Sequence, residues 1–301
     1  MALKTPILLI TFNRLDHVRR VLPEILKQEP QELYISQDGA RDGNESDRTK
    51  CHEVRDVINE LIAPYAVGHK DFTLHTNYIE RNLGCGRGPY EAMSWFYDHV
   101  EFGIVLEDDI LPHPLFWKYM EDLLVRYKDD ERVGMVCAHN LQRRYCGKKS
   151  YYFTYAMEGT LGWGTWKRVW KDFRFDIPFN AIKLRESLSY NYGFPNAMIK
   201  QYCQLYQKWL STDRHDCWDY QWDYYLLENG YLNARANSCL TSHEGDDEDA
   251  THKGYTNPNY KMSVNISLFT TITHPRIVRV HWKENIRAHW RSIKLTFNKA
   301  I

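Results

Sequence analysis

The sequence lacks the marks of several large protein classes. None of its apolar runs approaches the roughly 18 residues that would predict a membrane-spanning helix. The run Pro6–Ile10 is too short for the core of a signal peptide, and the polar Asn13 and Arg14 come soon after it, so we expect a cytoplasmic protein. The formal net charge is zero, which leaves no global electrostatic argument for a nucleic-acid partner.

Paired cysteines and common nucleophile motifs are also missing. The seven cysteines are an odd number and form no C-x-x-C pair, which favours reduced thiols over disulfides or a zinc site. No G-x-S-x-G motif of a serine hydrolase occurs. The sequence shows no internal repeat and no low-complexity linker.

What the chain has is an ordinary globular composition with many aromatic side chains. Its 301 residues are 43% hydrophobic and 26% charged, enough for a sizeable core. Aromatic residues make up 14%, including 21 Tyr and 10 Trp. Aromatic rings stack on sugars in carbohydrate-binding clefts, but a tyrosine-rich core explains the same composition.

Residues 1–140 alternate between short apolar runs and segments of helical periodicity. This pattern predicts a doubly wound, mostly parallel α/β sheet flanked by helices. The expected strands are 6–12, 33–36, 72–75, 102–106 and 133–137, and the expected helices are 15–26, about 54–63 (ending before Pro64), 88–100 and about 114–128.

The second half of the chain is less regular. Its expected elements are a strand at 151–156, a loop at Gly162-Trp163-Gly164, helices at about 165–173, 197–210 and 219–228, and a strand at 232–239. We expect one domain over 1–260, followed by a basic tail (261–301).

Polar side chains follow three of the predicted strands: Thr11-Phe12-Asn13-Arg14, Asp38 and Glu107-Asp108-Asp109. Ligands of such sheets bind beyond the carboxyl ends of the strands, so we expect these residues to converge on one crevice. Divalent cations take carboxylate oxygens, so the acidic triplet predicts a metal and diphosphate site. A solvated acidic turn is the alternative.

Two further segments carry candidate residues. Asn82–Gly88 is rich in glycine and precedes a helix, so its amides and Arg87 could bind a diphosphate, or Arg87 could lie on the surface. Trp218–Asp223 combines aromatic rings with Asp219 and Asp223 one helical turn apart, which suits a general base beside an aromatic platform. An aromatic helix packed into the core is an equal alternative.

The late part of the chain has an acidic segment and a basic one. His243 and His252 flank the acids of Glu244–Asp249 and could reach a metal or phosphate, or could be solvated in a loop. The residues 275–301 carry seven Lys or Arg against one Glu, together with scattered apolar residues. That segment could rest on an anionic membrane at its inner face, but a helix packed on the domain is the more common arrangement.

Several segments together resemble nucleotide-diphospho-sugar glycosyltransferases of the GT-A fold. The chain is most similar to the bacterial hemolytic-protein-like group and, more distantly, to N-acetylglucosaminyltransferase I. The segments that carry the resemblance, in order, are residues 6–14, 35–39, 82–85, 106–110 with Pro112 and Phe116, 162–166, 218–222 and 248–252. The residues Ser242–Gly245 depart from the expected pattern.

The resemblance implies roles for the matching residues. The donor would be bound by Thr11, Phe12, Asn13, Arg14, Asp38, Glu107, Asp108, Gly162, Trp163 and His252, and Arg87, outside the matching segments, is a further candidate for the diphosphate. The nucleotide-binding half would then be residues 1–140 and the acceptor half residues 141–260. Asp109 would hold Mn²⁺ or Mg²⁺, and Asp219 would be the general base, with Trp218, Trp222 and Asp223 on the acceptor side.

The resemblance therefore implies an inverting transfer of a hexose or N-acetylhexosamine from a nucleoside-diphosphate sugar, with UDP as the expected nucleotide. The acceptor would be a glycan or a lipid-linked sugar in surface polysaccharide synthesis. A sugar nucleotidyltransferase is one alternative, but Thr11–Arg14 is not the glycine- and lysine-rich loop which that reaction normally needs. A non-catalytic carbohydrate-binding protein is the other.

Overall fold

The structure is a computed structural model that describes residues 2–142, 147–155, 159–211, 217–245 and 260–288. In the first half, strands and helices alternate as expected. The elements are β1 (Ile7–Thr11), α1 (Leu15–Leu26), β2 (Glu32–Gln37), α2 (Glu45–Gly68), β3 (Thr73–Tyr78), α3 (Gly84–His99), β4 (Phe102–Glu107), β5 (Ile110–Pro112), α4 (Pro114–Arg126) and β6 (Val133–Cys137). Those of the second half are β7 (Tyr151–Thr154), β8 (Trp163–Trp166), α5 (Lys167–Trp170), α6 (Ala181–Tyr190), α7 (Asn196–Ser211), α8 (Trp218–Glu228), β9 (Leu232–Ala236) and β10 (Thr241–His243).

The main sheet has eight strands in the order β3-β2-β1-β4-β8-β6-β9-β7. The strands β3, β2, β1 and β4 are parallel, and the buried apolar runs of β1, β2 and β4 are typical of such strands. In this register Ile10 lies opposite Glu107 and Thr11 lies opposite Gln37, so β1, β2 and β4 end at one edge. The predicted α/β class with a mostly parallel sheet is confirmed.

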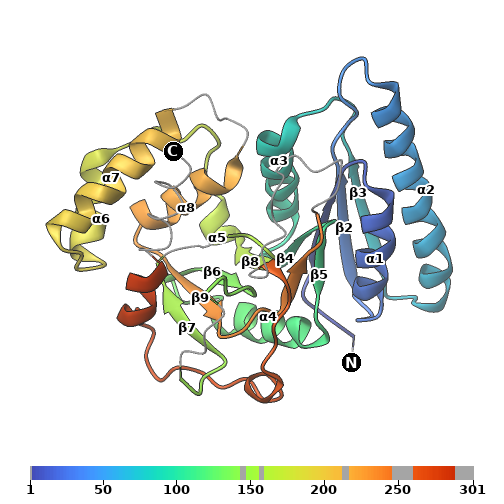
Figure 1. The fold of residues 1–301 in the computed structure, drawn as a ribbon. Coiled ribbons are helices and arrows are strands. Elements are labelled where there is room, and N and C mark those ends of the chain that lie inside the picture. The colour runs from blue at the N-terminus through green and yellow to red at the C-terminus, as the bar shows by residue number, and fades with distance from the viewer. Residues whose placement is uncertain (1, 143–146, 156–158, 212–216, 246–259, 289–301) are drawn as a thin grey trace.

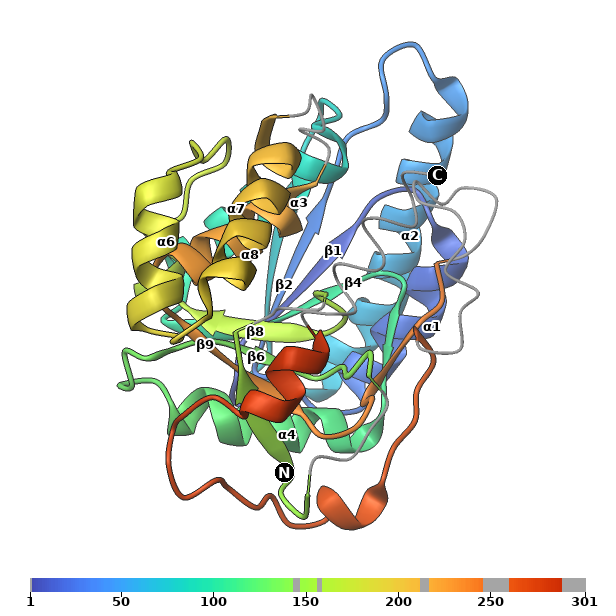
Figure 2. The same cartoon turned by 60° about the vertical axis from the view of Figure 1, so that its left-hand side comes forward.

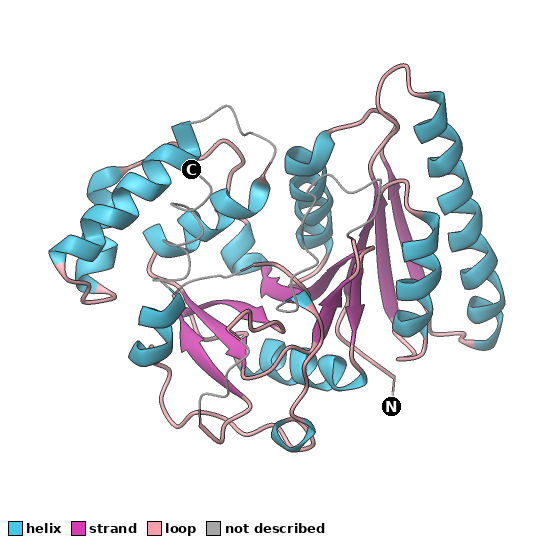
Figure 3. Ribbon diagram, viewed as in Figure 1, coloured by secondary structure: helices cyan, strands magenta, loops and turns pink. Residues whose placement is uncertain are grey.

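Helices cover both faces of this sheet (Figures 1 and 3). α1 and α2 lie on one side of β1–β3 and are joined by an ion pair between Arg19 and Glu60 (3.2 Å), whereas α3 lies on the other side. There the ring of Phe96 packs edge-on against Tyr34 of β2, with 5.0 Å between the ring centroids. This layering buries β1, β2 and β4, and in sheets of this kind ligands bind beyond the carboxyl ends of the strands.

The expected loop at Gly162-Trp163-Gly164 is wrong, because Trp163–Trp166 forms β8, inserted antiparallel between β4 and β6. The expected helix at 165–173 is correspondingly reduced to the short α5. Successive side chains of a strand point to opposite faces of the sheet, which explains why Trp and Gly are neighbours in β8. Trp163 stacks on Trp218 of α8 on one face, and Gly164 faces α4 on the other.

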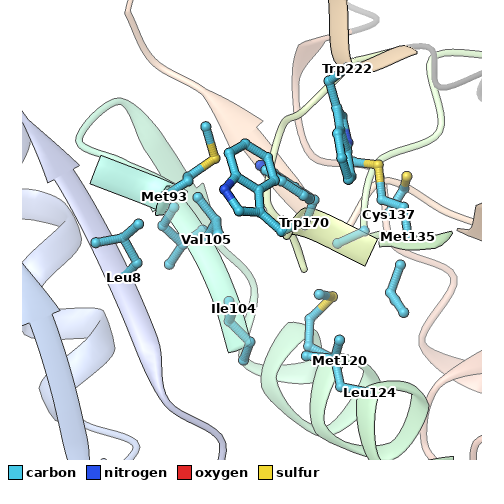
Figure 4. Packing of buried hydrophobic residues seen from close by; sticks show 14 of the residues in the cluster. Leu8, Met93, Ile104, Val105, Met120, Leu124, Met135, Cys137, Trp170 and Trp222 are labelled. Atoms are coloured by element: carbon cyan, nitrogen blue, oxygen red, sulfur yellow. The ribbon is translucent and has the colours of Figure 1, made fainter. Parts of the chain in front are cut away.

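The core on either side of β8 is continuous with the core beneath β4. Figure 4 shows Met120 and Leu124 of α4 on one side of these strands and Trp170 and Trp222 on the other. All four side chains are buried. The second half is therefore packed onto the first through the sheet itself.

The helix α2 was expected to end before Pro64, but it continues to Gly68. Proline removes one helical hydrogen bond. In the turn that follows, the ring of Tyr65 stacks on His69 (3.9 Å between centroids) and packs against Phe72 (4.9 Å). These contacts stabilise the last turn of α2. The prediction from Pro64 alone therefore ended this helix too early.

The described part of the C-terminal tail packs on β7. The amide of His281 donates to the carbonyl of Phe153 (2.8 Å), and the side chain of Asn285 accepts from the amide of Tyr155 (3.0 Å). Figures 1 and 2 show this segment beside β7 and β9. Among the described residues, no helix has the length and apolar character needed to cross a bilayer.

The contact between β8 and β4 predicts the effect of adding one methyl group. A Cβ at Gly164 would lie 2.5 Å from the carbonyl oxygen of Gly103, which is backbone and cannot turn away. We expect Gly164→Ala to lower the free energy of unfolding by about 1–3 kcal/mol, measured by chemical denaturation. The matched control is Gly68→Ala, where a Cβ would meet nothing within 4 Å. Equal stability of the two variants would contradict the packing described.

Candidate active site

The loops that follow β1 and β4 are joined by hydrogen bonds at the open edge of the sheet. The amide of Asp108 donates to the carbonyl of Ile10 (3.0 Å), and the amide of Phe12 donates to the Asp108 carboxylate (3.3 Å). Glu107 is the last residue of β4, and Asp108 and Asp109 follow it. The structure therefore brings the acidic triplet against the residues after β1.

Arg14 lies between two of these acids with one nitrogen on each. Its Nη2 pairs with Asp108 Oδ1, and its Nη1 lies 3.0 Å from Asp109 Oδ2. Both aspartates are buried, at 1% and 7% exposure. Burial by itself would lower the pKa of Arg14, but Asp108 and Asp109 raise it overall, so the guanidinium stays charged.

The carboxylates outnumber this arginine. Burial and, after it, the nearby Asp109 raise the pKa of Glu107 to about 8, although Arg14 opposes the shift. Asp219 of α8 is close enough to Glu107 to add to the repulsion. Burial also raises the pKa of Asp108, against the effect of Arg14. Two aspartates thus share one guanidinium beside Glu107, and this pairing leaves an excess of negative charge.

His243 and the two residues after it lie against Asp109. β10 pairs with β5, which sets His243 opposite Ile110. The imidazole Nε2 of His243 is 3.5 Å from Asp109 Oδ2, and the amide of Glu244 donates to the Asp109 carbonyl (2.8 Å). A Cβ at Gly245 would lie 2.3 Å from the same Oδ2, so a larger residue there would have to displace the Asp109 carboxylate.

Sequence reasoning gave His243 and Glu244 no firm role. The segment that could have placed them is Thr241–His243, directly before the acidic residues. It becomes informative only once its pairing with β5 is known. Glu244 also contacts Lys261 (3.1 Å) and Arg20 of α1 (3.8 Å). These ion pairs hold both flanks of residues 246–259 near Asp109. The predicted donor ligand His252 lies outside the described residues.

Asp38 binds the start of α3. Its carboxylate accepts hydrogen bonds from the amides of Gly39 (2.9 Å), Leu83 (2.9 Å) and Gly84 (3.0 Å), and from the Asn82 side chain (3.0 Å). Burial raises the pKa of Asp38, although these amides oppose the shift. The amides expected to bind a diphosphate thus bind a carboxylate of the chain itself. The nucleoside contact of Asp38 stays a prediction.

Arg87 lies at the surface at the start of α3. It pairs with Glu91 (3.2 Å) and Asp176 (3.4 Å), and its guanidinium lies 5.0 Å from the ring centroid of Phe175. Its side chain is 47% exposed. This arrangement agrees with the alternative interpretation of the sequence, in which Arg87 lies on the surface and does not bind a diphosphate.

The side chains of Thr11 and Asn13 bond inward rather than toward the acids. Thr11 Oγ1 donates to the carbonyl of Ser36 (3.3 Å), and the Asn13 amide donates to Asp47 (2.9 Å). The hydrogen bond from Arg41 lowers the pKa of Asp47 most. Thr11 and Asn13 therefore stabilise the loop that presents Arg14, and their donor contacts stay predictions.

The two tryptophans of α8 pack into the core. Trp218 stacks on Trp163 (5.6 Å between centroids, planes at 25°), and Trp222 is wholly buried. The Thr241 side chain would meet a Cβ at Gly162 at 2.7 Å, so this glycine lets β8 begin close to β10. The structure favours the core-packing alternative for both rings.

The acids of α8 differ in their surroundings. Asp223 accepts a hydrogen bond from the hydroxyl of Tyr206 on α7. Asp219 lies in the first turn of α8, near Glu107. The exposed aromatic residue beside Asp219 is Tyr220, which is 37% exposed and lies 4.5 Å from Trp209 between centroids. The sequence did not single out this pair, because the aromatic platform was assigned to Trp218 and Trp222.

The residues around Asp109 fit a hard divalent cation. Carboxylate oxygens and an imidazole nitrogen suit Mn²⁺ and Mg²⁺, and Asp109 and His243 offer one of each. In the described part of the chain, no group of three or more His, Cys, Asp or Glu side chains could hold a metal ion. A cation here would need oxygen ligands from a bound substrate or from water.

Neither a protein-family model nor a curated protein sequence matches the chain. Among solved structures, it is similar to the mannosyltransferase PcManGT from Pyrobaculum calidifontis, in complex with GDP-Man and Mn²⁺. The sequence identity is 13% and the TM-score is 0.41, and the match covers 83% of this chain. The chain spans 59% of the length of that protein's chain.

The raised pKa of Glu107 predicts a pH-dependent stability. A glutamate with an ordinary pKa of 4.5 loses its proton well below pH 8, whereas native Glu107 keeps it to about pH 8. The native state therefore binds more protons in this window, and stability falls as pH rises through it. We expect Glu107→Gln to gain stability over the wild type from about pH 5 to 8, by at most about 1.4 kcal/mol per pH unit.

Chemical denaturation at several pH values measures this difference. The control is Glu53→Gln on the exposed face of α2. A constant offset between Glu107→Gln and the wild type across the range would contradict the raised pKa.

Proposed function

We propose that the chain is an inverting glycosyltransferase that takes a sugar from a nucleoside-diphosphate donor, with UDP as the expected nucleotide. The observation that carries the proposal is that two buried aspartates, Asp108 and Asp109, share the one guanidinium of Arg14 beside Glu107. Such an excess of negative charge at the carboxyl ends of parallel strands suits a site completed by a divalent cation and a phosphate group. The acceptor is a glycan or a lipid-linked sugar, and the cytoplasmic location and membrane contact of the tail stay predictions.

The donor side is built on Asp109 and His243. These two side chains would hold Mn²⁺ or Mg²⁺, which when bound neutralises charge on the departing diphosphate. Glu107 and Asp108 would accept hydrogen bonds from hydroxyls of the sugar and ribose. With its raised pKa, Glu107 can hold a proton near neutral pH and can also donate one to a sugar oxygen.

The acceptor side is built on Asp219. A base must face the reacting atoms, and Asp219 is the α8 acid whose charge reaches Glu107. Its carboxylate would take the proton of the acceptor hydroxyl while that oxygen attacks the anomeric carbon in line. Asp223 lies toward α7 instead, where the hydroxyl of Tyr206 donates to it. Tyr220, exposed next to Asp219, could stack on an acceptor ring.

A screen of nucleotide sugars tests the proposal. UDP- and GDP-sugars are titrated with and without Mn²⁺ by calorimetry, and slow hydrolysis is followed for each. We expect metal-dependent binding, which Asp109→Asn abolishes because it removes the charge at the cation site.

Two results would contradict the proposal. Release of pyrophosphate from a nucleoside triphosphate and a sugar phosphate would identify a nucleotidyltransferase. Failure of every nucleotide sugar to bind with Mn²⁺ would leave a non-catalytic carbohydrate-binding protein.

The role of Asp219 gives a separate prediction. We expect Asp219→Asn to lower turnover of the selected donor by about 10²–10⁴-fold, because the amide cannot accept the proton. Binding of the nucleotide, measured by calorimetry, should be retained. Glu186→Gln on the exposed face of α6 is the control, and its turnover should stay near that of the wild type. Near-full turnover of Asp219→Asn would show that the base is another residue.

A further inference from the structure

One carboxylate oxygen, Asp109 Oδ2, has several neighbours. Arg14 Nη1 lies 3.0 Å from it, and His243 Nε2 lies 3.5 Å from it. The backbone at Gly245 covers both groups, since a Cβ there would lie 2.3 Å from Oδ2 and 2.9 Å from Arg14 Nη1. A metal ion bound to this oxygen would therefore meet the guanidinium at the same place.

The two contacts of Arg14 are not equivalent. Asp108 is also held by the amide of Phe12 at 3.3 Å, so its pairing with Arg14 lies within a fixed loop. Asp109 is held through its own backbone, because its carbonyl accepts from the amide of Glu244 at 2.8 Å. The contact between Arg14 and Asp109 can thus break without displacing either carboxylate.

We propose that Arg14 is an internal counter-ion that competes with the divalent cation for Asp109, so that metal and nucleoside diphosphate bind cooperatively. The inference rests on the proposed function. Two cations at one buried oxygen repel each other, and arginine cannot relieve this by losing its proton. It must move, and a diphosphate is an anionic partner with matching two-pronged geometry. Metal alone has to displace Arg14, whereas with a diphosphate present Arg14 gains a new partner.

Mn²⁺ titrations of the wild type and Arg14→Gln, with and without UDP or GDP, test this coupling without any activity assay. In the absence of nucleotide, we expect Arg14→Gln to bind Mn²⁺ about tenfold more tightly than the wild type. The factor by which the nucleotide raises Mn²⁺ affinity, of the order of 5–150-fold in coupled sites, should shrink toward one in the variant. Free Mn²⁺ is measured by electron paramagnetic resonance.

Two further variants keep the test decisive. Arg19→Gln removes another arginine of α1, paired with Glu60 at 3.2 Å, and should leave Mn²⁺ binding unchanged. Arg14→Lys keeps the charge but not the two-pronged contact, so its Mn²⁺ affinity should lie between those of the wild type and Arg14→Gln. Thermal melting establishes that each variant folds.

The failures are distinguishable. Equal Mn²⁺ affinity in the wild type and both Arg14 variants, with metal-dependent nucleotide binding intact, would overturn the competition and leave the proposed function standing. Weaker Mn²⁺ binding by Arg14→Gln without nucleotide would also overturn it. Absence of Mn²⁺ binding in all proteins under both conditions would overturn the proposed function and this inference together.

Discussion

Asp108 and Asp109 are buried carboxylates at the end of a parallel strand, and Arg14 is the cation that makes their burial tolerable. Unpaired charges at such depth are costly, so the loop after β1 has to present this arginine in one place. The inward hydrogen bonds of Thr11 and Asn13 hold that loop. The pairing leaves negative charge uncompensated, and this residual charge supports the proposed binding of a cation and a diphosphate.

The second half of the chain contributes to the site through two sheet contacts. β8 enters beside β4 and, through Trp163, holds α8 so that Asp219 approaches Glu107. β10 pairs with β5 and sets His243 beside Asp109. The first contact needs close backbone approach, which explains glycine at 164, and after the second the backbone at Gly245 lies against the side chains of Asp109 and Arg14. Packing in the core and composition of the site are therefore coupled.

Much of the first half was predictable because its signals are local. Buried parallel strands are continuous apolar runs, and a polar residue directly after such a run must lie at the ligand-binding edge. That rule placed Arg14, Asp108 and Asp109 correctly at one edge. It could not distinguish a residue that faces a ligand from one that bonds inward, as Asp38 and Asn13 do, since both follow strands.

The sequence by itself determined the α/β class, the strand ends that bear acids and the helix that carries Asp219, because periodicity and strand boundaries are written in consecutive residues. Only the tertiary structure decided that residues 163–166 form a strand, that Trp222 is core and that His243 lies beside Asp109. These outcomes depend on pairing between segments far apart in the chain. No local pattern encodes such pairing. The charge of the site depends on which distant residues the fold brings together.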